Sequence, residues 1–238
     1  MPVQDGRPRP RIVRAPISKV AFLVCSRSRI APLSECIAGI AAQTPVTGLA
    51  VDIVVADNAE TSRAEFIRSL HPGLHYVHEP ARGYSNVRNA ALRCALAATD
   101  ADVLIFIDDD AIPQADLLGA YDRLFAQQVA DVAAGGYVGQ KFASRHRNNQ
   151  KVATYNVAFR RWIADALQFC PQANLLGCED HEFFSDARRL GAIIRPCSQA
   201  RVLASRMRMS ISLWRITCRS ISGAPKVWRW RAQARASS

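Results

Sequence analysis

No apolar run in this sequence reaches the roughly 18 residues that a membrane-spanning helix needs. The longest apolar stretches, VAFLVC and VLIFI, have the length of strands. The first residues, MPVQDGRPRPRIVRAP, are basic and proline-rich, and they lack the apolar centre of a secretory signal. We therefore expect a flexible N-terminal lead-in over residues 1–17 and a cytoplasmic protein.

The seven cysteines contain no C-x-x-C pair, and their number is odd. Both features argue against a disulfide framework and against a zinc knuckle. We expect the cysteines to be small buried thiols.

Acidic residues are absent after Asp186, whereas the following residues to Ser238 contain eleven arginines and Lys226. The formal net charge of +11 therefore comes from this last part, and the rest of the chain is nearly neutral. A basic tail suggests an anionic partner, which could be a membrane surface, nucleic acid or an acidic protein. Residues 205–238 are predicted to form a basic, roughly amphipathic helix and tail, with Trp228 and Trp230 suited to a membrane interface.

The chain does have a regular alternation of short apolar runs with segments of helical periodicity. The runs KVAFLVCS, LAVDIVVAD, LHYVHE and VLIFIDDD predict strands, and segments such as APLSECIAGIAAQT and SNVRNAALRCALAATD predict helices. Because these runs are apolar throughout, they indicate a mostly parallel sheet in an α/β fold, flanked by helices on both faces. Two helix starts are predicted, one at Thr61 or Ser62, with a capping box from Ser62 to Glu65, and one at Ser85.

The pattern loosens after Lys141. FASRHRNNQK predicts a loop, and NVAFRRWIADAL predicts a helix or a strand that turns into one. CEDHEFFSDARRLG predicts a helix, and AIIRPCSQARVLA predicts one or two short strands.

Three of the predicted strands end in polar residues, at the edge of a parallel sheet where ligands bind. These residues are Ser26 and Arg27, Asp57 and Asn58, and Asp108, Asp109 and Asp110. Three adjacent carboxylates after a buried run need a positive partner. Asp108 and Asp110 would make a cradle for Mg²⁺ or Mn²⁺, which favour oxygen ligands and share them with phosphates. The simpler alternative is a solvated acidic turn.

Six segments, in order, resemble the family 2 glycosyltransferases, which have the GT-A fold. They are FLVCSRSR, IVVADNAE, ARGYSNVRNAAL, FIDDDAIP, AAGGYV and GCEDHEFFSDARRLGAIIRPC, over roughly residues 18 to 200. The resemblance implies a GT-A-type, Rossmann-like domain over residues 18–204. Its nucleotide-binding half is expected at 18–140 and its acceptor half at 141–204, followed by the basic arm.

The resemblance implies a metal-dependent, inverting transfer from a nucleotide-diphosphate sugar to a saccharide or lipid-linked acceptor. By matching positions, Asp110 would bind Mn²⁺ or Mg²⁺ directly, and Asp108 would hold it indirectly or bind the ribose. Asp57 would contact the nucleobase. Asp180 would be the general base, with Glu179 as second choice. The remaining donor-binding residues would be Ser26, Arg27, Asn58, Gly83, Arg88 and Asn89.

The assigned residues also have simpler explanations. Asp57 would cap a turn with Asn58, Arg88 and Asn89 would lie on a solvated helix face, and Glu179 and Asp180 would be acids that suit a helix dipole.

The resemblance points to cell-surface polysaccharide or glycolipid synthesis, with the tail docked at the inner face of the membrane. One departure from the family is that ARVLASRMRMS lacks the acidic residue often found after the last core strand. A catalytically impaired scaffold and a basic-tail protein that binds membrane or nucleic acid therefore remain alternatives. No nucleic-acid partner is expected, because the body is neutral and contains no recognisable nucleic-acid module.

Two other enzyme classes fit less well. An Asp-x-Asp phosphatase usually has its motif on the first strand, whereas here the motif follows the fourth. A nucleotidyltransferase would have a glycine-rich loop after the first strand, and CSRSRIAP has no glycine.

Overall fold

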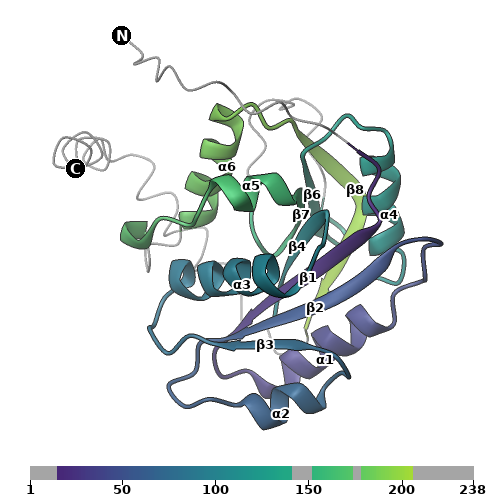
Figure 1. The fold of residues 1–238 in the computed structure, drawn as a ribbon. Helices are drawn as coiled ribbons and strands as arrows, with labels where there is room; N and C mark the ends of the chain where they lie inside the picture. Colours follow the sequence, from purple (N-terminus) through teal and green to yellow (C-terminus); the bar gives the residue numbers. More distant parts are fainter. Residues whose placement is uncertain (1–14, 141–151, 174–177, 206–238) are drawn as a thin grey trace, which may run out of the picture. The chain divides into compact units, whose positions relative to one another are not determined.

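The computed structural model describes residues 15–140, 152–173 and 178–205 (Figure 1). In these residues eight strands form one sheet, in the order β3-β2-β1-β4-β7-β6-β8-β5. The first half of the sheet contains β1 (Lys19–Ser26), β2 (Ala50–Asp57), β3 (His75–His78) and β4 (Val103–Asp108). These four strands are all parallel to their neighbours within this half.

The second half of the sheet mixes both strand directions. It contains β5 (Ala111–Pro113), β6 (Val132–Tyr137), β7 (Asn156–Arg160) and β8 (Ile194–Ala204). Strand β7 runs antiparallel to both β4 and β6, whereas β8 is parallel to β6 and antiparallel to β5. The expected mostly parallel α/β sheet is confirmed, with an antiparallel strand inserted at its centre.

Helices cover both faces of the sheet. One face carries α1 (Ile30–Ala41), α2 (Ala64–Ser69) and α4 (Leu117–Ala126). The other face carries α3 (Tyr84–Ala98), α5 (Arg161–Ala166) and α6 (Glu179–Arg189). A short 3₁₀ helix, η1, spans Pro171–Ala173.

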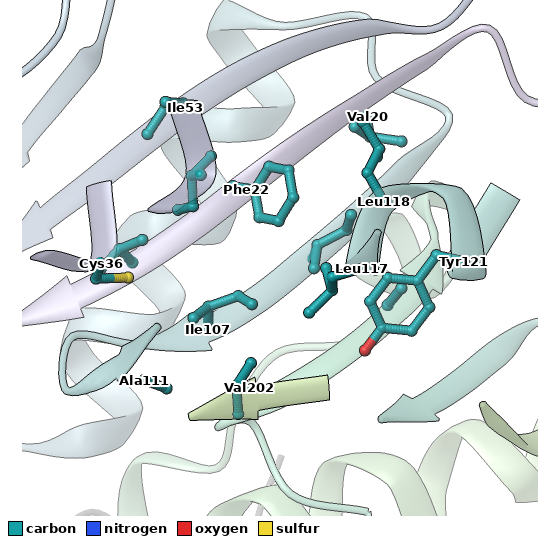
Figure 2. Packing of buried hydrophobic residues seen from close by; sticks show 14 of the residues in the cluster. Val20, Phe22, Cys36, Ile53, Ile107, Ala111, Leu117, Leu118, Tyr121 and Val202 are labelled. Carbon is teal, nitrogen blue, oxygen red and sulfur yellow. The ribbon is translucent and has the colours of Figure 1, made fainter. Parts of the chain in front are cut away.

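The apolar run of strand β1 is continuous because both faces of the strand are buried. Val20 and Phe22 belong to the core under α1 and α4, which Figure 2 shows, whereas Ala21 and Leu23 belong to the core under α3. Phe22 and Leu23 are both 0% exposed. Burial of a side chain of this size stabilises the fold by about 2 kcal/mol, so both faces of the strand contribute to stability.

Two details of the second half refine the sequence-based predictions. AIIRPCSQARVLA forms the single 11-residue strand β8 rather than two short ones, and it pairs with β6 and then β5. NVAFRRWIADAL is a strand that turns into a helix, β7 followed directly by α5.

Both predicted helix caps are wrong. Helix α2 begins at Ala64, and the Ser62 hydroxyl instead lies 2.6 Å from the hydroxyl of Tyr76. Ser85 lies inside α3, where its hydroxyl donates to the Cys170 carbonyl at 2.8 Å. In both cases a partner from a distant segment replaces the backbone amide that a local cap would bind.

The described cysteines form no disulfide with one another. Cys36 and Cys197 are buried as expected, whereas the other four in the described ranges are half-buried. The predicted loop FASRHRNNQK and the predicted basic helix and tail, with Trp228 and Trp230, lie outside the described residues. Among the helices that the structure describes, none is long and apolar enough to cross a bilayer.

Candidate functional site

The carboxyl ends of β1, β2 and β4 meet at one edge of the sheet. Ser26 is in register with Asp57 on one side, and Cys25 is in register with Asp108 on the other. The structure therefore brings together the three polar strand ends that the sequence singles out. This adjacency follows from the strand order β2-β1-β4.

Arg29 is a positive partner of the aspartates after β4. Its Nη1 atom lies 2.6 Å from Oδ2 of Asp110 and 3.4 Å from Oδ1 of Asp109. Burial raises the pKa of Asp109 to about 6, although the Ser26 hydroxyl and the Arg29 charge partly offset this effect. The aspartates are thus not a simple solvated turn, because Asp109 and Asp110 are both buried.

Sequence analysis missed Arg29. Its only signal is its place in SRSR, where Arg27 is an equally plausible choice. The structure separates the two arginines, because the nearest acidic partner of Arg27 is the exposed Glu60, at 3.8 Å.

The aspartates fit a divalent cation that is shared with phosphates. In the described ranges, no group of three or more His, Cys, Asp or Glu side chains is placed to hold a metal ion. Mg²⁺ in nucleotide sites typically uses only one or two carboxylates and completes its shell with phosphate oxygens and water. Asp108 and Asp110 supply such a pair, so the residues present suit this kind of site rather than an all-protein metal cage.

Asp57 is fully buried, and its carboxylate is heavily hydrogen-bonded. Arg63 donates to Oδ1 from Nη2 at 2.6 Å and from Nε at 3.0 Å, and the Ala59 amide donates at 3.1 Å. Tyr76 donates to Oδ2 at 3.0 Å. Burial alone would raise the pKa of Asp57, but these hydrogen bonds outweigh it and lower the pKa. Asp57 therefore does cap the turn, and Arg63 is a partner that no local pattern indicated.

Asn58 holds the segment that leads to Gly83. Its Nδ2 donates to the carbonyls of Glu79 at 2.6 Å and Ala81 at 2.9 Å, and its Oδ1 accepts from the Gly83 amide at 3.3 Å. Gly83 has a φ of 139°, which disfavours any residue with a side chain. Helix α3 starts directly after it.

Arg88 and Asn89 on α3 are not on a solvated face. The Arg88 side chain is 11% exposed and forms an ion pair with Glu179. Its guanidinium also lies over the rings of Tyr84 and Phe169, at 5.4 and 5.6 Å from their centroids. Asn89 is buried, and it exchanges two hydrogen bonds with the backbone of Phe169, at 2.8 and 2.9 Å.

Glu179 and Asp180 begin helix α6, and both are buried. Burial raises the pKa of Asp180 to about 6; Arg88 lowers it, and Glu179 raises it. Oε2 of Glu179 is buried with no hydrogen-bond partner among the described residues. A helix-dipole role alone does not account for two buried acids, since exposed positions would serve it equally well.

Arg88 connects the two acidic parts of the site. Its charge interacts with Glu179, Asp180 and Asp108. The residues after β4 and those at the start of α6 therefore share one electrostatic environment.

Comparisons with known proteins identify the family of the chain. A family model described as "Glycosyl transferase family 2" matches residues 22–181. No curated protein matches the chain.

Several solved structures share the fold. The mannosyltransferase PcManGT from Pyrobaculum calidifontis, in complex with GDP-Man and Mn²⁺, is 21% identical with a TM-score of 0.64, over 85% of this chain and 61% of that one. TarS from S. aureus in complex with UDP-GlcNAc is 16% identical with a TM-score of 0.61, over 81% and 60%. Glucosyl-3-phosphoglycerate synthase from Mycobacterium tuberculosis, in complex with phosphoglyceric acid, is 22% identical with a TM-score of 0.57, over 82% and 75%. The chain thus spans about three fifths of the length of the first two.

Proposed function

The chain belongs to glycosyl transferase family 2 and has the GT-A fold, and from this premise we propose that it transfers a sugar from a nucleotide-diphosphate donor to a saccharide or lipid-linked acceptor. The observation that carries the proposal is the meeting of Ser26, Asp57 and Asp108 at one edge of the sheet. Two proteins of similar fold bind GDP-Man with Mn²⁺ and UDP-GlcNAc, which supports a donor of this class.

Asp110 and Asp108 would hold Mn²⁺ or Mg²⁺ against the donor diphosphate. When bound, the cation would stabilise the negative charge of the departing nucleoside diphosphate. Ser26, Arg27, Asp57 and Gly83 would surround the nucleoside part of the donor. Because the Asp57 carboxylate is covered by Arg63, the nucleobase contact would fall to the two residues together.

Asp180 is the proposed general base. It would take the proton of the acceptor hydroxyl as that oxygen attacks the anomeric carbon, and direct displacement would invert the configuration. Its pKa of about 6 leaves it ionised at neutral pH and more basic than an ordinary aspartate. Glu179 already forms an ion pair with Arg88. This contact favours Asp180 over Glu179 as the general base.

Nucleotide binding tests the proposal. UDP, GDP, dTDP and CMP would each be titrated calorimetrically, with and without Mn²⁺, into the wild type, Asp110→Asn and Asp116→Asn. Asp116 is a matched control because its carboxylate also pairs with an arginine, Arg123, but is 61% exposed. One nucleotide should bind only with Mn²⁺, and Asp110→Asn alone should lose this binding. If none of them binds to the folded wild type, the proposal is wrong.

Sugar transfer separates the enzyme from an impaired scaffold. A scaffold would bind the same nucleotide with Mn²⁺, but it would neither transfer nor slowly hydrolyse the matching nucleotide sugar. The measurement is release of nucleoside diphosphate, and Asp180→Asn serves as the inactive control.

The proposal extends to synthesis of a cell-surface polysaccharide or glycolipid at the inner face of the membrane, through the basic tail. Flotation of the full chain with anionic and neutral vesicles tests this part. Trp228→Ser/Trp230→Ser should float less with anionic vesicles than the wild type. Equal flotation of the two proteins would contradict the role of the tail.

A further inference from the structure

Arg29 and Asp110 connect the two loops that face the proposed donor site. Arg29 follows strand β1 and immediately precedes α1, whereas Asp110 follows strand β4. The two strands are neighbours in the sheet, so the loops meet although the residues are 81 positions apart. The contact is charge-assisted, at 2.6 Å.

The two sides of this contact differ in burial. The Asp110 side chain is 11% exposed and that of Asp109 is 9%, whereas the Arg29 side chain is 57% exposed. The turn that carries the aspartates is also fixed by its backbone, because the Ser205 amide donates to the Asp110 carbonyl at 2.7 Å. If the pair separates, the exposed arginine can rotate into water, whereas the turn that carries the aspartates is still held by its backbone.

A buried carboxylate without a countercharge is costly. Arg29 therefore stabilises the aspartates in the structure as described. A divalent cation that binds Asp110 would compete with this guanidinium for the same carboxylate. A guanidinium that leaves the carboxylate is well suited to a diphosphate, because its planar donors match phosphate oxygens.

We propose that Arg29 is a built-in counter-ion that a divalent cation displaces from Asp110, and that the displaced guanidinium then binds the diphosphate of the donor. This inference rests on the proposed function. It makes Arg29 the residue that couples the two ligands. The cation alone has to break the Arg29–Asp110 pair, whereas with a diphosphate present the guanidinium gains a new partner. Each ligand therefore strengthens the binding of the other.

The experiment measures Mn²⁺ binding without any reaction. MnCl₂ is titrated calorimetrically into the wild type, Arg29→Gln and Arg123→Gln, first alone and then with the nucleoside diphosphate that the wild type binds. Arg123→Gln is a matched control, because Arg123 is 53% exposed and its Nη2 lies 2.6 Å from Asp116. Thermal unfolding checks that all three proteins are folded.

Arg29→Gln should bind Mn²⁺ alone about tenfold more tightly than the wild type, within the usual range of coupling between two sites. The factor by which the nucleotide improves Mn²⁺ binding should be smaller in Arg29→Gln than in the wild type. Arg123→Gln should match the wild type in both measurements.

Equal or weaker binding of Mn²⁺ alone by Arg29→Gln would overturn the inference, and so would an unchanged effect of the nucleotide. In those cases the wild type still binds Mn²⁺ and nucleotide, so the proposed function survives. If no folded protein in the set binds either ligand, both the proposed function and this inference are wrong.

Discussion

Arg88 on helix α3 and Glu179 at the start of helix α6 form a buried ion pair, although they are 91 residues apart in the sequence. The pair joins the helix after Gly83 to the acidic residues that include the proposed base. Because the Glu179 side chain is removed from water, its carboxylate depends on Arg88 for a countercharge.

Breaking this pair should destabilise the fold. Arg88→Met leaves the Glu179 carboxylate buried without its partner, so the free energy of unfolding should fall by about 3 kcal/mol. The double variant Arg88→Met/Glu179→Met should recover part of this loss, because it removes both charges. Urea unfolding measures the effect. Arg123→Met breaks an exposed pair and should change the free energy of unfolding little. A double variant no more stable than Arg88→Met would contradict the prediction.

Asp180 should make stability depend on pH. Its folded-state pKa is about 6, above the ordinary value of 3.8, so its stabilising contribution is present at low pH and is lost as the pH rises through about 6. Asp180→Asn does not titrate, so from about pH 4.5 to 7.5 its unfolding free energy should rise relative to the wild type by about 2 kcal/mol. Asp109 titrates in both proteins, so its contribution to the pH dependence cancels when the two unfolding free energies are subtracted. A difference that stays constant with pH would show that Asp180 has an ordinary pKa.

Asn89 should hold Phe169 in place. Asn89→Ala leaves the amide and the carbonyl of Phe169 without their partners, and each buried polar group left unpaired costs about 1–3 kcal/mol. We expect a stability loss of about 2 kcal/mol or more and faster amide hydrogen exchange at Phe169. Asn86 on the same helix makes its hydrogen bonds at an exposed position, so Asn86→Ala should change both readouts little. Unchanged exchange at Phe169 in Asn89→Ala would count against this role.

Gly135 should not tolerate a side chain. A Cβ at this position would lie 2.4 Å from Nδ2 of Asn156 and 2.6 Å from the Tyr121 hydroxyl. Those two buried side chains are hydrogen-bonded to each other at 2.6 Å, so neither can move freely. Gly135→Ala should cost about 3 kcal/mol in urea unfolding.

Gly119→Ala is the control for this substitution. Its Cβ would lie 2.5 Å from Oδ1 of Asp116, an exposed side chain that can rotate away. Alanine also favours a helix more than glycine does, so Gly119→Ala should be neutral or stabilising. Equal losses at Gly135 and Gly119 would show that the crowding around Gly135 is not what matters.

The sequence predicted the elements of the fold better than their partners. The run VAFLVC identified a strand buried on both faces, and the polar residues at strand ends, such as Asp57 and Asp108, lie at the expected edge of the sheet. These features depend on local pattern. The antiparallel direction of β7 could not be predicted, because an apolar run carries no signal of its direction in the sheet.

Partners from distant segments account for the remaining errors. Arg29 looks like any solvated arginine in a polar loop, and only the fold brings it to Asp110. Ser62 fits a local capping pattern, but its hydroxyl instead forms a hydrogen bond with the hydroxyl of Tyr76. Such contacts depend on which loops meet in space, and a single sequence does not contain that information in any local window.

The strand order has a consequence for how this site can diversify. From β1 the chain moves outward to β2 and β3, then returns to β4 on the opposite side of β1. The outward excursion includes a turn at Gly73, where a φ of +76° and open space leave room for a longer connection. Lengthening a surface loop costs little free energy, and an insertion there would leave the Arg29–Asp110 contact unchanged. Related sequences can therefore vary in the outer part of the sheet while the contacts at its centre stay the same.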